Sequence, residues 1–201
     1  CSSDLGVFLH DSDRDNYPPT PRISAWCMRQ MMKSMQLALY HGVLPQKSYY
    51  QTRTGLTYLK VEHGLYTLPD ANQELKSELK QFTTQFTHTL GIIGHIRLEK
   101  NYSLVMQAIK ELPNFALIVA GSASNSNVDI ELLKQEAKIL GISDRVVWIN
   151  RYLSEGEMRS VIESCNTIAL YYSSTFSAQS GILNQVAPLR KTVIVSDLPN
   201  A

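Results

Sequence analysis

Five short runs of apolar, mostly β-branched residues recur in the second half of the chain, and segments with helical spacing separate them. Apolar runs without polar alternation are typical of strands that are buried on both faces of a parallel sheet. Strand and helix patterns that alternate in this way indicate βαβ units, and they predict an open, doubly wound α/β domain from about residue 88 onward. The expected strands are Thr89–Ile93, Phe115–Ala120, Val146–Ile149, Ile168–Tyr171 and Val193–Ser196.

Two of the helical segments carry end signals. Gly141 follows the periodic residues of one helix and fits the position just beyond a helix end, where a left-handed backbone favours glycine. Ser154 and Glu157 have the Ser-x-x-Glu spacing of a capping box, in which each side chain accepts a backbone N–H of the other residue. These signals predict one helix that ends before Gly141 and another that begins after Ser154.

The first half of the chain is less regular and predicts a separate unit. Residues 11–21 are polar and rich in proline, which is typical of a loop, whereas residues 23–39 are rich in Met, Gln, Leu and Ala and predict one helix. Residues 59–66 predict a short strand that runs into a turn at Gly64. The polar stretch 68–85 is interpreted as a linker with an exposed helix, so we expect a domain boundary near residues 67–87.

Composition and charge exclude several classes of protein. The 19 Lys and Arg residues nearly balance the 18 Asp and Glu residues, so no excess of positive charge indicates a nucleic-acid partner. No apolar run approaches the roughly 18 residues of a membrane-spanning helix. The 3 cysteines lack a Cys-x-x-Cys pair, which excludes a zinc finger and a disulfide scaffold and favours a reducing, cytoplasmic setting. The glycine patterns of nicotinamide dehydrogenases and of P-loop NTPases are also missing.

The loop that follows the first strand of the second half carries two cations. Arg97 and Lys100 lie within residues 94–101, between a predicted strand and a predicted helix. Ligands of open α/β sheets bind at this end of the strands, and a helix N-terminus attracts anions. Arg97 can bind two phosphate oxygens at once and Lys100 adds a compact charge, so the loop predicts phosphate binding. In the alternative interpretation both side chains lie in solvent, with Lys100 paired to Glu99 or Glu111.

A second candidate lies after the fourth strand of the same sheet. Ser180 and Gly181 begin an apolar helix, and Gly181 would let a ligand approach the backbone closely. The alternative is an ordinary serine cap with a glycine beside it.

The ordered set of motifs resembles the donor-binding domain of retaining glycosyltransferases of the GT-B fold. Within that class it is most similar to the group 1 family, which includes glycogen synthase, sucrose synthase and bacterial mannosyltransferases. The resemblance is carried by Gly94–Asn101 (GHIRLEKN), Leu117–Gly121 (LIVAG), Leu140–Asn150 (LGISDRVVWIN) and Ser180–Ala201, and less strongly by His10-Asp11 and Val61–Tyr66.

The resemblance implies transfer of a hexosyl group, with retention, from a UDP-, GDP- or ADP-sugar to a saccharide or lipid acceptor, without a metal or other cofactor. The chain is interpreted as an internal piece of such an enzyme. Residues 1–67 would be the end of the acceptor-side domain, residues 68–87 the linker, and residues 88–201 the nucleotide-sugar domain, truncated at its end. Because acceptor domains of this family often touch a membrane, the resemblance also implies a peripheral contact with the inner membrane face.

The family's binding residues transfer to particular positions of this sequence. Arg97 and Lys100 would neutralise the diphosphate that leaves, and Ser180 and Gly181 would lie against the sugar and the diphosphate. Residues 150–153 would line the base through backbone contacts. The implied donor-binding residues are Arg97, Lys100, Gly121, Tyr152, Ser180, Gly181 and Gln185, of which Gln185 takes the place of a ribose-binding glutamate; no catalytic residue is assigned.

The sequence departs from the family in its carboxylates. No Asp or Glu occurs between Glu163 and Asp197, so the family's Glu-x7-Glu pattern, expected near residues 176–177 and 184–185, is missing. A glutamine at 185 can still form hydrogen bonds with ribose hydroxyls. The departure keeps two alternatives open: a catalytically inactive glycosyltransferase-like partner protein, and an unrelated α/β protein, such as an epimerase-like enzyme, that binds a phosphorylated metabolite.

Overall fold

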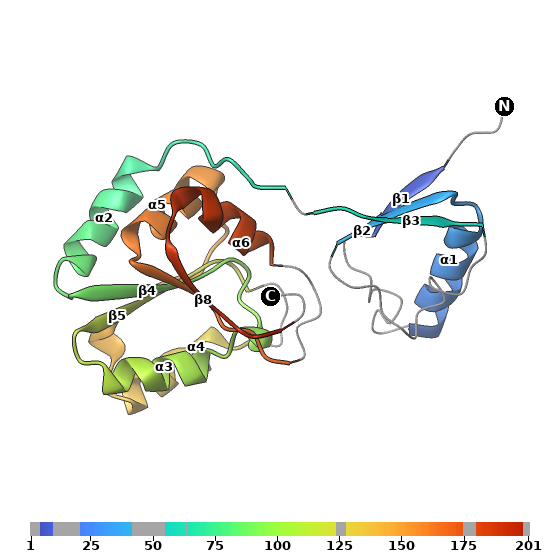
Figure 1. Ribbon diagram of the computed structural model, residues 1–201. Helices are drawn as coiled ribbons and strands as arrows, with labels where there is room; N and C mark the ends of the chain where they lie inside the picture. The colour runs from blue at the N-terminus through green and yellow to red at the C-terminus, as the bar shows by residue number, and fades with distance from the viewer. Residues whose placement is uncertain are drawn as a thin grey trace. The chain divides into compact units, whose positions relative to one another are not determined.

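The computed structural model describes residues 5–9, 21–41, 55–62, 64–123, 128–174 and 180–198 (Figure 1). The chain divides into two compact units, and each contains its own parallel sheet: one comprises residues up to Gly64 together with the short stretches that hold Ser180 and Leu198, and the other comprises Leu65–Thr175 and Gly181–Asp197. We call them the N-terminal unit and the C-terminal unit. The loop predicted over 11–21 lies outside the described residues except for Pro21, which begins a helix, and His10 and His63 also lie outside them.

The N-terminal unit is a three-stranded parallel sheet in the order β1-β2-β3, with one helix. The strands are β1 (Gly6–Leu9), β2 (Leu37–Tyr40) and β3 (Thr57–Lys60), and the helix α1 (Pro21–Lys33) joins β1 to β2. Met32 of α1 packs with Leu9 and Ala38 of the sheet. In contrast, Phe8 and Leu59 are about half exposed.

The single helix predicted over residues 23–39 is wrong at its end. The helix ends at Lys33, and residues 37–40 form the central strand β2, which pairs with both β1 and β3. Leu, Ala, Met and Gln all have high helix propensity, so local preference favours a continuous helix here. Pairing on two sides overrides that preference. The short strand expected within 59–66 is present but lies earlier, as β3.

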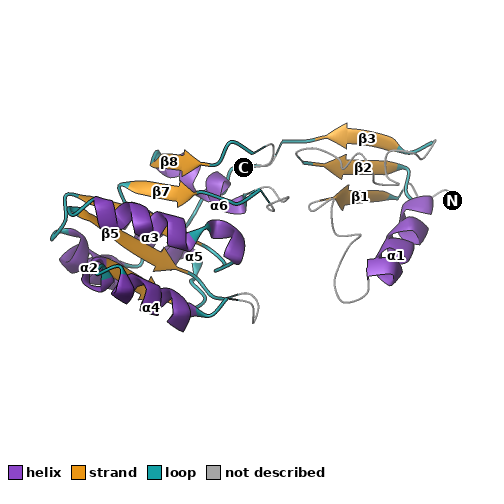
Figure 2. Cartoon of the chain, turned by 90° about the horizontal axis from the view of Figure 1, so that it is seen from below, coloured by secondary structure: helices purple, strands orange, loops and turns teal. Residues whose placement is uncertain are grey.

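The C-terminal unit confirms the predicted doubly wound α/β fold. Its five parallel strands have the order β6-β5-β4-β7-β8. In the chain they are β4 (His88–Ile93), β5 (Phe115–Ala120), β6 (Val146–Ile149), β7 (Thr167–Leu170) and β8 (Thr192–Val195). Helices α3 (Tyr102–Glu111) and α4 (Ile130–Ile139) cover one face of the sheet, and α2 (Gln73–Thr83) and α5 (Glu155–Ser164) cover the other (Figures 1 and 2).

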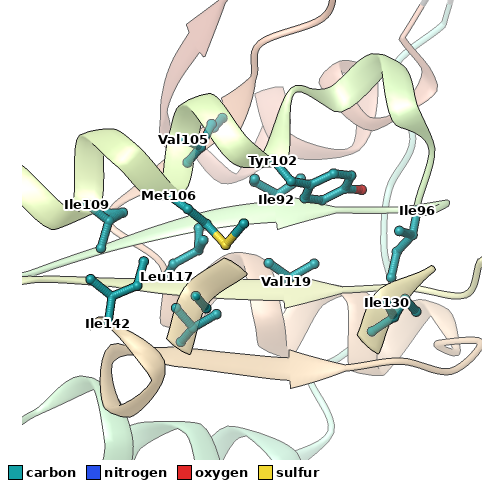
Figure 3. Packing of buried hydrophobic residues seen from close by; sticks show 13 residues of the cluster. Ile92, Ile96, Tyr102, Val105, Met106, Ile109, Leu117, Val119, Ile130 and Ile142 are labelled. Atoms are coloured by element: carbon teal, nitrogen blue, oxygen red, sulfur yellow. The ribbon is translucent and has the colours of Figure 1, made fainter. Parts of the chain in front are cut away.

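The main core lies between this sheet and helices α3 and α4. Met106 and Ile109 of α3 point toward Leu117 and Val119 of β5 (Figure 3). Each of these side chains is at most 1% exposed, and burial of one such side chain contributes about 1.5–3 kcal/mol. The core therefore holds α3 firmly against the sheet, and the loop that enters α3 has a fixed anchor at its end.

The helix expected to be exposed within a linker is instead packed into the C-terminal unit. Leu75 and Leu79 of α2 are buried, and α2 packs along α5. The segment before α2 is fastened to α5 as well: the Asn72 N–H donates to the Gly156 carbonyl (3.1 Å), and the Ser160 hydroxyl donates to the Asn72 carbonyl (2.8 Å). The polar composition of 68–85 conceals a narrow apolar stripe with i, i+4 spacing, which is enough to dock a helix.

The predicted helix ends are confirmed. Gly141 has a left-handed backbone (φ +72°) just beyond α4. Ser154 and Glu157 form the reciprocal capping box at the start of α5. None of the helices among the described residues combines the length and the apolar character that a bilayer span needs.

Candidate functional site

The candidate site lies at the carboxyl edge of the C-terminal unit's sheet, where the strand order reverses. The chain starts at the central strand β4, moves outward to β5 and β6, and then returns to the other side of β4 to form β7 and β8. The helices that follow β4 and β5 therefore lie on one face of the sheet, and helix α5, which follows β6, lies on the other (Figure 1). Ligands of open α/β sheets bind at such a reversal point.

Two glycines let the loops after β4 and β5 touch. Gly94 and Gly121 both have positive φ (+89° and +144°), and a Cβ atom on Gly121 would lie 2.2 Å from the Gly94 carbonyl oxygen. The Gly94 N–H donates to the Ala120 carbonyl (2.9 Å), so the contact is also hydrogen-bonded. Only glycine fits at 121, and the reason is packing within the protein. Its role in donor binding stays a prediction.

Lys100 is a buried cation at this edge. It ends the single turn η3 (Leu98–Lys100), is 7% exposed, and its Nζ donates to the carbonyl of Ile93, the last residue of β4 (2.6 Å). The alternative in which Lys100 lies in solvent and pairs with Glu99 or Glu111 is wrong. Across the described parts of the chain, no carboxylate forms an ion pair with Lys100.

The environment of Lys100 disfavours the protonated, charged form of its amine. Burial, and secondarily the positive charge of Arg97, lower the pKa of the Lys100 amine to about 7. A buried ammonium group without a carboxylate partner lacks the counter-charge that buried cations usually have. An anion arriving at this edge would supply it.

Arg97 lies at the other end of the same turn. Its backbone is extended (φ −138°, ψ 150°), its carbonyl accepts the Lys100 N–H (3.2 Å), and its side chain is exposed. Within residues 64–123 and 128–174 no ion pair involves its guanidinium group. The turn therefore presents one exposed and one buried cation, and both predicted phosphate ligands lie in one loop.

The remaining predicted residues lie in other segments of the chain. Ser180 is buried and directly precedes α6 (Gly181–Val186), while a Cβ atom on Gly181 would meet no protein atom within 4 Å, so packing does not require glycine there. Gln185 lies in α6, and its buried Oε1 has no hydrogen-bond partner among the described residues. Tyr152 follows β6 and is 77% exposed. It lies two strands from β4, roughly 10 Å away at the usual strand spacing.

The structure also shows a set of contacts at this edge that the sequence analysis missed. The Asn101 side chain donates from Nδ2 to the Tyr171 carbonyl (3.3 Å), the Ser196 hydroxyl donates to the Tyr172 carbonyl (2.6 Å), and the Ser173 N–H donates to the Glu99 carbonyl (2.7 Å). Asn101 has a left-handed backbone (φ +49°), which asparagine tolerates better than most residues. An asparagine directly before a predicted helix was the one sequence signal for this feature.

Within the described ranges, no three His, Cys, Asp or Glu side chains come together as metal ligands. The described residues 184–185 carry no carboxylate, and positions 176–177 lie outside the described residues. The absence of a metal requirement stays a prediction.

Two parallel sheets in one chain, the second with a cationic loop at its reversal point, agree with the GT-B fold that the sequence predicts. Among solved structures, HepE from Anabaena in complex with UDP and glucose matches this chain with a TM-score of 0.74 and 16% identity, over 97% of this chain and 53% of HepE. Sucrose-phosphate synthase from Thermosynechococcus elongatus matches with a TM-score of 0.65 and 13% identity, over 96% of this chain and 50% of the synthase.

A third match is a point mutant of TarM from S. aureus in complex with fondaparinux, alpha-GlcNAc-glycerol and UDP. Its TM-score is 0.61 at 11% identity, over 97% of this chain and 37% of TarM. The chain thus spans about half the length of HepE and of the synthase. No protein-family model matches the sequence, and no curated protein sequence matches it. At these identities the likeness is one of fold, and it confirms the expected GT-B architecture.

Proposed function

We propose that the C-terminal unit binds the nucleoside-diphosphate sugar of a hexosyltransferase, which transfers the sugar with retention to a saccharide or lipid acceptor. The observation that carries this proposal is the buried, carboxylate-free Lys100 beside the exposed Arg97 at the strand-order reversal. The fold supports it, because HepE with the same architecture was crystallised with UDP-glucose.

The two cations suit the chemistry of sugar transfer. When the bond between the sugar and the diphosphate breaks, negative charge grows on the diphosphate, and cations already in place stabilise that transition state. Arg97 is free to bind two oxygens in parallel, and Lys100 is held by the Ile93 carbonyl close to the same edge. These protein cations would do the work that a metal ion does in other glycosyltransferases.

The start of α3 adds to the positive potential. The first backbone N–H groups of an α-helix have no acceptor within the helix. Asn101 precedes the helix, but its side chain is turned to the Tyr171 carbonyl and forms no cap hydrogen bond. The partial positive charge at this end of the ten-residue helix therefore adds to the charges of Arg97 and Lys100.

For the rest of the donor, we assign Gln185 to the ribose, Tyr152 and the loop 150–153 to the base, and Ser180, Gly181 and Gly121 to the sugar and diphosphate. The Gln185 amide oxygen has unused acceptor capacity. Lys100 follows β4 and Tyr152 follows β6, and these two strands lie roughly 10 Å apart at the usual strand spacing. This spacing suits a ligand with a base at one end and a diphosphate at the other.

The N-terminal unit would serve the acceptor. Helix α1 exposes Ile23 and Trp26, each 61% exposed. An apolar surface of this kind suits the proposed lipid acceptor or a peripheral contact with the inner membrane face, in line with the cytoplasmic setting that the cysteines favour. The separation into an acceptor part and a donor part belongs to the same proposal, with residues 65–87, which belong to the C-terminal unit, counted to the donor part.

A second function, a catalytically inactive glycosyltransferase-like partner, is favoured by one observation. The sequence has no Asp or Glu between Glu163 and Asp197, where the resemblance implies one carboxylate that contacts the transferred sugar and one that binds the ribose. Such a protein would bind the nucleotide through Arg97 and Lys100 without turning the donor over.

Two measurements on the full-length protein test both functions: nucleotide binding, and sugar transfer from the nucleotide sugar that corresponds to the nucleotide bound. The full-length protein is titrated calorimetrically with UDP, GDP and ADP, next to an Arg97→Ala/Lys100→Ala variant and a Lys110→Ala control, whose exposed lysine lies at the far end of α3. Hydrogen bonds to charged groups contribute roughly 1.5–3 kcal/mol each, so loss of both cations should weaken binding by about 100-fold or more. Binding together with sugar transfer supports the enzyme, binding without transfer supports the inactive partner, and no binding by the wild type refutes both.

A further inference from the structure

We infer that Asn101 and Ser196 are positioning residues that lock the Arg97–Lys100 turn against the chain segment after β7 and thereby set the affinity for the diphosphate. This inference rests on the proposed function. The loop clamp, as we call it, consists of the side chains of Asn101 and Ser196, the Glu99 carbonyl and the backbone of residues 171–173.

The clamp joins three loops at one edge of the sheet. All three of its hydrogen bonds end on the consecutive residues 171–173. Tyr171, Tyr172 and Ser173 each use one backbone group: the first two carbonyls accept from Asn101 and Ser196, and the Ser173 N–H donates to Glu99. The loops follow β4, β7 and β8, which are neighbours in the sheet. Tyr172 and Ser196 are 6% and 8% exposed, so little water competes for the bond between them.

Lys100 lies at the centre of this arrangement. Both of its chain neighbours, Glu99 and Asn101, are hydrogen-bonded to the segment 171–173. Its own backbone N–H donates to the Arg97 carbonyl, and its ammonium group reaches the Ile93 carbonyl. The position of the buried cation therefore depends on bonds that its neighbours make to a distant part of the chain.

The backbone at Asn101 explains why a clamp is needed. A left-handed residue separates the turn η3 from α3, so the chain changes direction directly after Lys100. This conformation is unfavourable for side chains other than glycine and, to a lesser degree, asparagine. The bond from Asn101 to Tyr171 fixes this bend, and the bond from Ser196 fixes the segment to which Asn101 is attached.

Two substitutions remove the clamp side chains while sparing the backbone. Asn101→Gly removes the whole side chain, the amide included, and leaves a residue that adopts positive φ without strain, so this variant should fold. Ser196→Ala deletes the hydroxyl, and Ser196→Thr restores it. Arg190→Gly is the matched backbone control, because Arg190 is the other described non-glycine residue with positive φ (+52°). Ser164→Ala is the matched hydroxyl control, since its hydroxyl donates to the Ser160 carbonyl within α5 (2.8 Å).

The first readout is calorimetric titration of the full-length protein with UDP, GDP and ADP, and with inorganic pyrophosphate as a probe without a base. We expect Asn101→Gly and Ser196→Ala to bind the nucleotide and pyrophosphate at least tenfold more weakly than wild type, with Ser196→Thr and both controls within twofold. An equal affinity of clamp variants and wild type for pyrophosphate overturns the inference.

The second readout follows Lys100 itself and does not require a ligand. Reductive ¹³C-methylation of the lysines allows the amine to be titrated by NMR, and the Lys100 resonance is identified by its loss in Lys100→Arg. If the clamp keeps this amine buried, its pKa rises in both clamp variants, because water reaches the charge; a purely structural role elsewhere in the fold would leave it unchanged. If the wild type binds no diphosphate, the proposed function fails, and an unaltered Lys100 titration in the variants then refutes the clamp separately.

Discussion

Two groups of basic residues in the C-terminal unit differ in how their charges are balanced. Between α2 and α5, Lys76 and Arg159 both pair with Glu163 (2.5 and 2.8 Å), and each of these groups is at least partly exposed. At the carboxyl edge of the sheet, Lys100 is more deeply buried and its ammonium group donates to a carbonyl oxygen. A paired cation on the surface needs no further explanation, whereas a buried cation without a carboxylate indicates that its counter-charge comes from a ligand.

The two regions also differ in their backbone conformation. At the sheet edge, Gly94, Gly121 and Asn101 have positive φ, and the loops touch backbone to backbone. In the α2–α5 region the close contact is at Gly156, where a Cβ atom would lie 2.9 Å from the Asp70 carbonyl oxygen. The sheet edge thus depends on left-handed conformations, which suit its two glycines and cost stability at Asn101, whereas the close contact of the helical face involves a glycine inside a helix.

The largest expected effect is that of Gly121→Ala. The new Cβ atom would overlap the Gly94 carbonyl, and the backbone is unfavourable for alanine, so we expect a loss of about 3 kcal/mol or more in the free energy of unfolding, together with loss of nucleotide binding. Gly156→Ala is the comparison from the other region: its Cβ atom would lie 2.9 Å from the Asp70 carbonyl oxygen, a milder overlap at a helical backbone, and alanine gains about 1 kcal/mol of helix propensity, so we expect a smaller loss. Urea unfolding measures both, and equal losses in the two variants would contradict the comparison.

The next effect concerns Lys100→Met. Removal of the buried charge should weaken UDP, GDP or ADP binding by roughly 100-fold, about 2–3 kcal/mol. The same change should leave the free energy of unfolding unchanged or raised, because no buried charge then has to be desolvated. Calorimetry and urea unfolding of one sample separate the two outcomes. A variant that is strongly destabilised but binds normally would show that Lys100 is structural.

A smaller effect is the dependence of binding on pH. Burial and Arg97 lower the pKa of Lys100 to about 7, and a bound diphosphate would raise it, so binding takes up a proton. Above pH 7 the free protein has lost this proton, and the affinity should fall by close to tenfold per pH unit, about 1.4 kcal/mol. Titrations between about pH 7.5 and 8.5, where the phosphate groups no longer titrate, measure the slope. Lys100→Arg keeps its charge and should flatten the slope, and an equally steep slope in that variant would assign the proton elsewhere.

The smallest effect is that of Glu163→Gln in the α2–α5 region. Hydrogen bonds from Lys76 and then from Arg159 lower the pKa of Glu163 in the folded protein. The unfolded chain therefore binds the proton more tightly, so this stabilisation is present above the ordinary carboxyl pKa and is lost as the pH falls through the folded pKa. Because the ion pairs are partly exposed, we expect a loss of about 1 kcal/mol at neutral pH, measured by thermal unfolding, and unchanged nucleotide binding. A large loss of binding would contradict the separation of the two regions.

The strands β4 to β8 could be predicted from sequence because most of them are β-branched runs buried on both faces. Strand β2 could not, since Leu37–Tyr40 owes its conformation to pairing with β1 and β3 rather than to local preference. The docking of α2 was missed because only two leucines, Leu75 and Leu79, are buried in an otherwise polar helix.

The residue types of the site could be predicted from the sequence, but their burial and their hydrogen bonds could not. Arg97 and Lys100 could be chosen from their place between a strand and a helix. The burial of Lys100 could not, because it follows from the way the chain bends at Asn101. The loop clamp joins Asn101 to residues 171–173 and 196, which are distant in the chain and meet only because β4, β7 and β8 are neighbours in the sheet.

The attachment of residues 68–72 to α5 has a practical consequence for anyone who expresses the C-terminal unit separately. A gene fragment cut at residue 88, where the first strand of the sheet begins, would remove α2 and the partners that Arg159, Ser160 and Glu163 have within residues 68–76. A fragment that begins at Leu65 keeps these contacts. Limited proteolysis from its N-terminus should stop at Leu68, because this residue is only 6% exposed. The boundary for cloning thus lies about twenty residues before the first strand of the sheet.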